Sequence, residues 1–106
     1  MASDLCAIGV DLGGTKTELA LVNGSGTILK KIRLATAAQE GPDAVTEKIS
    51  GSVRALLRDS GRHAVGLGVG VAGQIGSSGE TIRFAPNLAW HNVPLQTALQ
   101  RQLGDS

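Results

Sequence analysis

The sequence predicts one α/β domain with a mixed sheet, and the chain length and the order of its segments support this. Three extended segments come first, and a long amphipathic helix then leads to a fourth apolar segment. Consecutive strands with short turns pair antiparallel, whereas a helical crossover returns the chain parallel to an earlier strand. The 106 residues, 42% of them hydrophobic, suffice for one core. We therefore expect residues 1–106 to form a single domain.

The first three strands are predicted from apolar runs and turn residues. Residues 5–10 form a continuous apolar run that ends at Asp11, and residues 17–22 form a second strand. The Asn-Gly-Ser-Gly run at residues 23–26 supplies a turn before a third strand at residues 27–34. One parity of this third strand is mostly apolar and the other mostly basic, so we expect it to be half-exposed.

A helix is predicted to begin at Pro42 and to end at Gly61. Its apolar positions recur at helical spacing and comprise Val45, Ile49, Val53, Leu56 and Leu57. Gly51 falls inside the helix at a cost of about 1 kcal/mol relative to alanine. We expect this glycine to mark close packing on the sheet.

The C-terminal part predicts one more strand, a short extended piece and a second helix. Residues 64–72 form the fourth strand, and residues 81–84 follow a glycine-rich turn. We expect Asn92 to cap a helix with Pro94 in its first turn. Its apolar stripe comprises Leu95, Ala98, Leu99 and Leu103, and Gly104 would end it. The predicted order is β-β-β-α-β-(β)-α.

Composition argues against several classes of partner. The net charge is +1, and the lysines and arginines are spread along the chain, which predicts binding neither to nucleic acid nor to a membrane surface. No apolar run approaches the roughly 20 residues of a membrane span. Cys6, His63 and His91 are too few and too scattered for a structural zinc site. The N-terminus lacks a signal-peptide pattern, so we expect a cytoplasmic protein.

Two familiar phosphate-binding motifs do not fit the glycine-rich stretches. A P-loop places Gly-Lys-[Ser/Thr] between a strand and a helix, whereas here a Thr separates Gly14 from Lys16 and a strand follows. Residues 68–73 match Gly-x-Gly-x-x-Gly, but no helix is predicted after them to bind a pyrophosphate. We expect these glycines to allow a helix or a ligand to lie close to the strand.

The stretch DLGGTKT, which starts at Asp11, predicts a hairpin tip that could bind a phosphate. Backbone amides of Gly13 and Gly14, the hydroxyl of Thr15 and the cation of Lys16 would surround the phosphate. Asp11 could hold Mg²⁺ through water. The alternative is an ordinary Gly-Gly hairpin with a surface lysine.

Two blocks of sequence extend this interpretation. DLGGTKT after a strand resembles the first phosphate motif of the actin-like ATPase superfamily, and GVGVAGQIG followed by FAPNLAWHNVPL is similar to the ROK family of sugar kinases and repressors. The resemblance covers nearly the whole chain. It implies a mixed sheet of the ribonuclease H-like and actin-like ATPase type, with the order β-β-β-α-β-α, which stops before the next strand of that fold.

The resemblance also implies site residues and ligands. ATP and Mg²⁺ would be bound by Asp11, Gly13, Gly14, Thr15 and Lys16. The sugar pocket would include Gly73, Gln74 and Asn87, although Asn87 is also a common turn residue. No catalytic residue is assigned, because the Asp that serves as base in similar kinases comes on the next strand, and Asp105 does not match it.

The resemblance implies the N-terminal part of a glucokinase-like hexose kinase, inactive without its C-terminal domain. The alternatives are part of a ROK-type transcriptional regulator and a non-catalytic module that binds a sugar or a phosphate. Because the sheet would lack its next strand, we expect an unpaired edge that promotes self-association. The residues do not select among hexoses.

Overall fold

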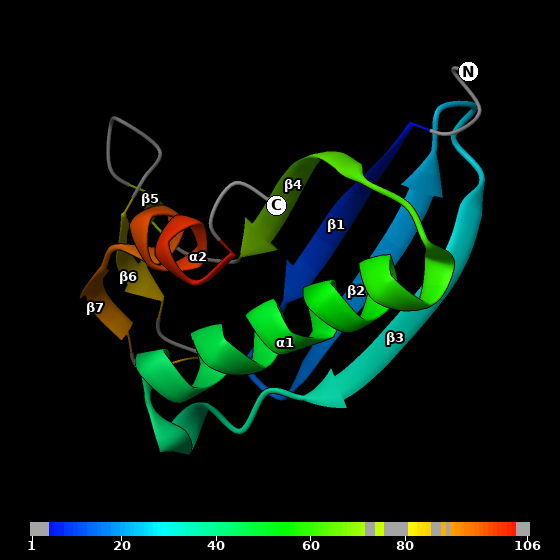
Figure 1. Cartoon of the computed structure of the whole chain (residues 1–106). Helices are drawn as coiled ribbons and strands as arrows, with labels where there is room; N and C mark the ends of the chain where they lie inside the picture. The colour runs from blue at the N-terminus through cyan, green and yellow to red at the C-terminus, as the bar shows by residue number, and fades with distance from the viewer. Residues whose placement is uncertain (1–4, 72–73, 76–80, 86–87, 89, 104–106) are drawn as a thin grey trace.

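The structure is a computed structural model that describes residues 5–71, 74–75, 81–85, 88 and 90–103. The strands form a four-stranded sheet of order β3-β2-β1-β4 and a three-stranded sheet of order β5-β6-β7. Figure 1 shows the helices and strands. Their bounds are β1 Cys6–Leu12, β2 Lys16–Asn23, β3 Ile28–Ala35, the 3-10 helix Ala38–Glu40, α1 Pro42–Ser60, β4 Ala64–Val71, β5 Gln74–Ile75, β6 Ile82–Ala85, β7 Trp90–Val93 and α2 Leu95–Leu103.

The larger sheet is mixed, as the order of segments predicts. Strand β1 pairs antiparallel with β2 and parallel with β4, and β2 pairs antiparallel with β3. Helix α1 makes the crossover from β3 to β4 and lies along one face of the sheet (Figure 1). Strand β1 continues past its predicted end because Asp11 pairs with both Glu18 and Gly70, and Leu12 pairs likewise with both neighbours.

The core lies between α1 and one face of this sheet. Alternate residues of β1 are buried, and these side chains form one cluster with those of β2 and α1. The members from the three elements are Cys6, Ile8, Val10, Leu12, Leu19, Leu21, Val45, Ile49, Val53 and Leu56. Each large aliphatic side chain contributes about 1.5–3 kcal/mol when it is fully buried. Apart from Cys6, this part of the core is aliphatic, as the scarcity of aromatic residues indicates.

The ends of α1 agree with the sequence. Pro42 occupies the first turn, where its missing N–H costs no hydrogen bond. Gly61 adopts a left-handed conformation with φ 68°, and its N–H donates to the carbonyl of Leu57 at 2.9 Å. This left-handed cap is the conformation that glycine tolerates best.

The region before α2 differs from the prediction. Residues Trp90–Val93 form strand β7, which pairs antiparallel with β6, so Asn92 belongs to a strand and does not cap α2. Asn92 instead has a positive φ of 51°, a conformation that Asn adopts more readily than most residues. Helix α2 begins at Leu95, and Pro94 precedes it, with its carbonyl accepting the N–H of Ala98 at 3.0 Å. Gly104 lies outside the described residues.

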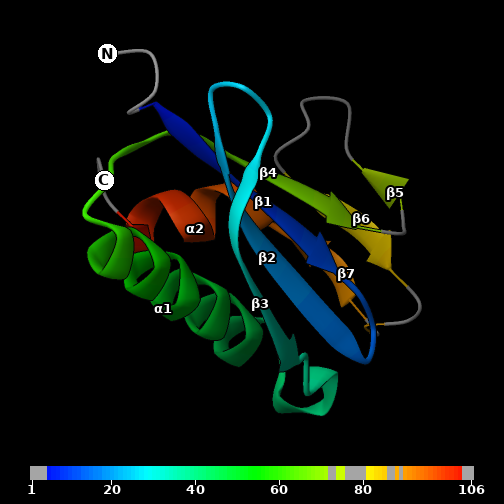
Figure 2. The same ribbon diagram turned by 90° about the vertical axis from the view of Figure 1, so that its right-hand side faces the viewer.

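Helix α2 packs beside α1 on the same side of the larger sheet (Figure 2). The Ser50 hydroxyl donates to the Gln102 side-chain oxygen at 2.6 Å, and Arg54 donates to the Gln102 backbone carbonyl. The apolar stripe of α2 contributes Leu95 and Leu99 to the core. Trp90 is also in the core, and its indole N–H finds no acceptor among the described residues.

The glycines do not pack as the sequence suggests. Gly51 is exposed on α1, and a Cβ added there would meet nothing within 4 Å. Gly66 and Gly68 of β4 also face open space, and a Cβ at Gly70 would approach only the Val10 carbonyl oxygen, at 3.9 Å. The expectation of close packing is therefore wrong at Gly51, and no helix lies close to the described glycines of β4, because α1 covers the opposite face of the sheet (Figure 1). That a ligand lies close to β4 stays a prediction.

The open surroundings of Gly51 lead to a stability prediction. Gly51→Ala should raise the free energy of unfolding by about 1 kcal/mol, because alanine has the better helix propensity and meets no neighbour. Gly61→Ala is the matched control and should destabilise, since its φ is positive. Urea unfolding followed by circular dichroism measures both. A Gly51→Ala variant no more stable than the wild type would contradict the prediction.

Candidate functional site: the hairpin between β1 and β2

The turn between β1 and β2 needs a glycine at its first position. The N–H of Gly13 donates to the carbonyl of Lys16 at 3.0 Å, which closes the turn. A Cβ at Gly13 would lie 2.7 Å from that same carbonyl oxygen, a distance that real side chains do not reach. The backbone amides of Gly14 and Thr15 donate to no acceptor among the described residues. The turn is therefore tight, and it leaves amide donors for a ligand.

Asp11 lies near the end of β1 on the face of the sheet opposite to α1. The alternation of β1 buries its neighbours Val10 and Leu12 and leaves Asp11 exposed. In the register of the sheet, Asp11 lies between Glu18 of β2 and Gly70 of β4. Because Gly70 has no side chain, space is open beside the carboxylate on that side. Asp11 precedes Gly13 by two residues, and the structure places its side chain on an accessible face of the sheet beside the turn.

The second carboxylate beside Asp11 is already paired. Arg33 of β3 donates to Glu18 through Nε at 3.1 Å and Nη2 at 3.0 Å. These hydrogen bonds, followed by the charge of Arg33, hold the pKa of Glu18 below its usual value of 4.5, and Lys31 and Lys16 add to the effect. Glu18 is therefore ionised and engaged with Arg33, whereas Asp11 has no ion pair among the described residues.

Thr36, which no sequence motif indicated, forms hydrogen bonds to the hairpin. The hydroxyl of Thr36 donates to the carbonyl of Gly13 at 2.7 Å, and its N–H donates to the carbonyl of Thr15 at 2.9 Å. The hydroxyls of Thr17 and Thr36 are 2.7 Å apart, and both side chains are buried. No sequence pattern signals this contact, because 23 residues separate Thr36 from Gly13.

The predicted sugar-binding residues are described only in part. Gly73 and Asn87 lie outside the described residues, and Gln74 is the first residue of β5. Strand β4 ends at Val71, which pairs with Leu12 at the end of β1. Parallel strands run in the same direction, so β4 ends on the same side of the sheet as β1, where the hairpin lies. The segment that contains Gln74 therefore starts from that side.

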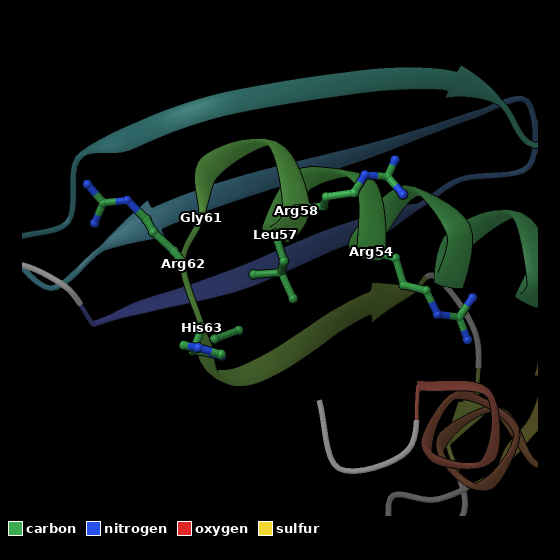
Figure 3. Close-up of a pocket in the computed structure, with 7 residues that line it drawn as sticks. Arg54, Leu57, Arg58, Gly61, Arg62 and His63 are labelled. Carbon is green, nitrogen blue, oxygen red and sulfur yellow. The ribbon is translucent and has the colours of Figure 1, made fainter.

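A pocket lies at the other end of the sheet. It is lined by Arg54, Leu57, Arg58, Gly61, Arg62, His63 and Ala64. Ala64 begins β4 and pairs with Cys6 at the start of β1, so this pocket is a strand length away from the Gly13 turn. The arginine side chains point in different directions, and Arg54 reaches toward α2 (Figure 3). Because the guanidinium groups do not converge, we assign no ligand to this pocket.

The remaining sequence interpretations concern the glycine run at the end of β4, a zinc site and a membrane span. Strand β5 begins at Gln74, directly after the Gly-x-Gly-x-x-Gly run, so the two residues described there form a strand and not the start of the helix that a dinucleotide site requires. His63 is exposed, and Cys6 is buried with its thiol donating to the carbonyl of His63 at 3.1 Å. The described residues contain no cluster of three potential metal ligands from His, Cys, Asp and Glu. None of the described helices is both long and apolar enough to cross a membrane.

The sheet of order β3-β2-β1-β4, with α1 and α2 on one face and a glycine turn after β1, has the actin-like ATPase fold. The sequence profile of the ROK family matches residues 7–105, and the chain belongs to this family. A glucokinase from Thermotoga maritima is 39% identical over 98 residues, which cover 92% of this chain and 30% of the relative. A xylose repressor from Caldicellulosiruptor bescii is 28% identical over 99 residues, which cover 90% of this chain and 25% of the repressor.

The solved structures agree with this assignment. The crystal structure of a ROK family glucokinase from Streptomyces griseus, in complex with glucose and AMPPNP, has a TM-score of 0.83 with this chain and 30% sequence identity. The match covers 93% of this chain and 30% of that one. The chain thus spans about 30% of the length of the glucokinases that it matches.

The ion pair of Glu18 leads to a prediction about pH. Because the pKa of Glu18 is lower in the folded state, its contribution to stability is complete above the unfolded value and is lost as the pH falls through the folded value. Between about pH 6 and pH 3, the free energy of unfolding should therefore fall less steeply in Glu18→Gln than in the wild type. Glu47→Gln, an exposed position on α1, is the control and should keep the wild-type slope. Identical slopes for all three proteins in urea titrations would contradict the prediction.

Proposed function

We propose that residues 1–106 form the N-terminal subdomain of a cytoplasmic, ATP-dependent sugar kinase of the glucokinase type. The observation that carries the proposal is the hairpin after β1, where a turn closed by Gly13 leaves the amides of Gly14 and Thr15 without acceptors. The exposed side chains of Asp11 and Lys16 flank this turn. The glucokinase relatives supply the reaction class, and a phosphate ligand fits the donors of the turn.

The hairpin offers three kinds of donor to the phosphates of ATP. The amides of Gly14 and Thr15 supply neutral donors, the Thr15 hydroxyl supplies another, and the ammonium of Lys16 supplies charge. A charge-assisted hydrogen bond from lysine to a phosphate is stronger than a bond between neutral groups. Gly13 shapes the turn and brings the backbone close to the ligand.

Asp11 fits the role of an outer ligand for Mg²⁺ that accompanies ATP. Magnesium prefers carboxylate oxygens and keeps several of its waters, so a single exposed carboxylate can hold it through water. Asp11 suits this role better than Glu18, because Arg33 already occupies the Glu18 carboxylate. When bound, the metal would neutralise charge on the phosphates.

The sugar would bind next to the hairpin, near the segment that follows β4. We propose that Gly73, Gln74 and Asn87 line this pocket, since amide groups both donate to and accept from sugar hydroxyls. The pairing of Leu12 with Val71 brings the start of this segment to the end of β1. We assign no general base within this chain, so phosphoryl transfer requires the rest of the kinase.

A ROK-type regulator is the second candidate function. The match to a xylose repressor supports it, because the alignment covers 90% of this chain and 28% of the aligned residues are identical. The two functions differ in their need for nucleotide, since a kinase subdomain requires the phosphate site and a sugar-responsive regulator does not. Binding of Mg-ATP therefore discriminates between them.

The test is a titration of the ¹⁵N-labelled chain with ATP, in the presence and absence of Mg²⁺, followed by amide chemical shifts and calorimetry. We expect saturable binding with shifts concentrated at residues 13–16. Lys16→Gln should weaken binding about tenfold, or about 1.4 kcal/mol, with or without the metal. Asp11→Asn should weaken binding only when Mg²⁺ is present.

Two matched variants control for general effects of charge. Lys30→Gln removes an exposed lysine from β3, and Asp43→Asn removes an exposed carboxylate from the first turn of α1. Both should bind Mg-ATP like the wild type. The kinase proposal fails if the wild type binds no nucleotide, or if Lys16→Gln and Lys30→Gln bind equally well. Binding of glucose without any binding of nucleotide would favour the regulator.

We also propose that two copies of this chain associate through the free edge of β4. Among the described residues β4 pairs only with β1, and its sequence carries no charged residue. The opposite edge, β3, exposes Lys30, Lys31 and Arg33, and such charges prevent strands from pairing edge to edge. Val65 of β4 is 70% exposed, which leaves an apolar side chain beside the uncharged edge.

Sedimentation at increasing protein concentration tests the association. The wild type should form dimers, and Val65→Lys should weaken them, because a charge on an edge strand opposes pairing. Ile28→Lys is the control, since Ile28 is 54% exposed on β3 at the other edge. A wild type that stays monomeric at every concentration would refute the proposal, as would equal weakening by the two variants.

A further inference from the structure

Thr36 is connected to both carbonyl groups of the hairpin that face it. The residue follows β3 and is 0% exposed. Its hydroxyl proton is used on the carbonyl of Gly13, so in the 2.7 Å contact between the two hydroxyls Thr17 must be the donor. Its backbone N–H binds the carbonyl of Thr15 at 2.9 Å. Every polar hydrogen of Thr36 therefore bonds within or to this network.

These bonds fix the orientation of two peptide units. The described residues contain no cis peptide bond, and in a trans peptide the C=O and the following N–H point in opposite directions. Since Thr36 holds the oxygen of Gly13, the N–H of Gly14 must point away from Thr36. The same argument applies to the oxygen of Thr15 and the N–H of Lys16.

We infer that Thr36 is a positioning residue for the phosphate-binding hairpin, an inference that rests on the proposed function. A carbonyl oxygen near a phosphate repels it, whereas an amide N–H attracts it. By bonding the oxygens of Gly13 and Thr15, Thr36 keeps them on its own side and leaves the N–H of Gly14, which has no acceptor among the described residues, for the ligand. Thr36 itself does not contact the phosphate.

The surroundings of Thr36 keep it in place. Lys48 of α1 donates to the carbonyl of Thr36 at 3.5 Å and to that of Ala35 at 3.4 Å. The next residue, Ala37, has a left-handed backbone with φ 53°, an uncommon conformation for a residue with a Cβ. Such a conformation persists only where the surrounding contacts determine it. The position of the hairpin is thus coupled through Thr36 to helix α1.

A purely structural role is the alternative, and the chain offers a matched control for it. Thr46 is also buried, at 1% exposed, and its hydroxyl donates to the carbonyl of Pro42 at 2.6 Å within α1. Thr36→Val and Thr46→Val each remove one buried hydroxyl and keep the shape of the side chain. They should lower the stability of the protein by similar amounts, but only Thr36→Val disturbs the hairpin.

The experiment measures ATP affinity, hairpin amide shifts and urea stability for Thr36→Val, Thr36→Ser and Thr46→Val in the same chain. Thr36→Val should weaken Mg-ATP binding about five- to tenfold and shift the amide of Gly14 before ligand is added, because the bond from the hydroxyl to the Gly13 carbonyl is lost. Thr36→Ser keeps the hydroxyl and should restore binding to within about twofold. Thr46→Val should bind like the wild type.

The outcomes separate this inference from the proposed function. If the wild type binds ATP and Thr36→Val binds equally well, the inference is overturned while the kinase proposal survives. If the wild type binds no ATP, the proposed function fails, and an unchanged amide shift of Gly14 in Thr36→Val would overturn the positioning role as well. If Thr36→Val does not fold, Thr17→Val decides instead, because loss of its proton should loosen the Thr36 hydroxyl and weaken binding about two- to threefold. Wild-type affinity in a folded Thr17→Val would then overturn the inference.

Discussion

The alternation of residues in β1 is the constraint on which the rest of the structure depends. This strand lies between β2 and β4, and its even-numbered residues from Cys6 to Leu12 are all buried against α1. Because side chains alternate across a strand, the odd-numbered residues must point to the other face. Gly9 and Asp11 are exposed there as a direct result. A one-residue slip of β1 would bury Asp11 and expose the core.

Much of the larger sheet could be predicted from the sequence, because local patterns determine it. The apolar run of β1, the turn after β2 and the helical spacing of α1 each lie within a few residues, and all three appear in the structure. The Asn23 side chain shows why the turn is recognisable, since its oxygen accepts from the N–H groups of Ser25 and Thr27. The pairing of β1 with β4 follows from the crossover through α1.

The smaller sheet could be predicted only in part, since the extended piece at residues 81–84 corresponds to β6, whereas the sequence does not predict β5 or β7. Asn92 is a favourable helix cap in isolation, yet the pairing of Ile82 with Val93 and of Phe84 with His91 makes a strand there. Such short strands depend on partners elsewhere in the chain and leave little trace in the sequence. Gly51 illustrates the reverse error, because a glycine in a helix suggests close packing although the position is exposed. Propensity is a weak guide wherever tertiary contacts decide.

The residues of the candidate site are also of two kinds. Some belong to one short stretch of sequence, and one is brought to the site by distant contacts. Asp11, Gly13 and Lys16 are found from one short motif, because a phosphate-binding turn needs its residues next to one another. Thr36 is not found, since its two bonds to the hairpin join segments that only the antiparallel pairing of β2 with β3 brings together. The motif thus predicts which groups can contact a ligand, and the fold shows which distant residue is hydrogen-bonded to the hairpin.

The two faces of the larger sheet differ in what their side chains contribute. On the α1 face, aliphatic side chains supply the burial that stabilises the domain. On the other face, Gly9, Gly68 and Gly70 leave the backbone bare, and Asp11 contributes charge instead of burial. A site on the bare face can therefore change its side chains at little cost to the core. Thr36 differs from the residues of both faces, because it is buried and its hydroxyl donates to the carbonyl of Gly13, so this residue joins the packed interior to the candidate site.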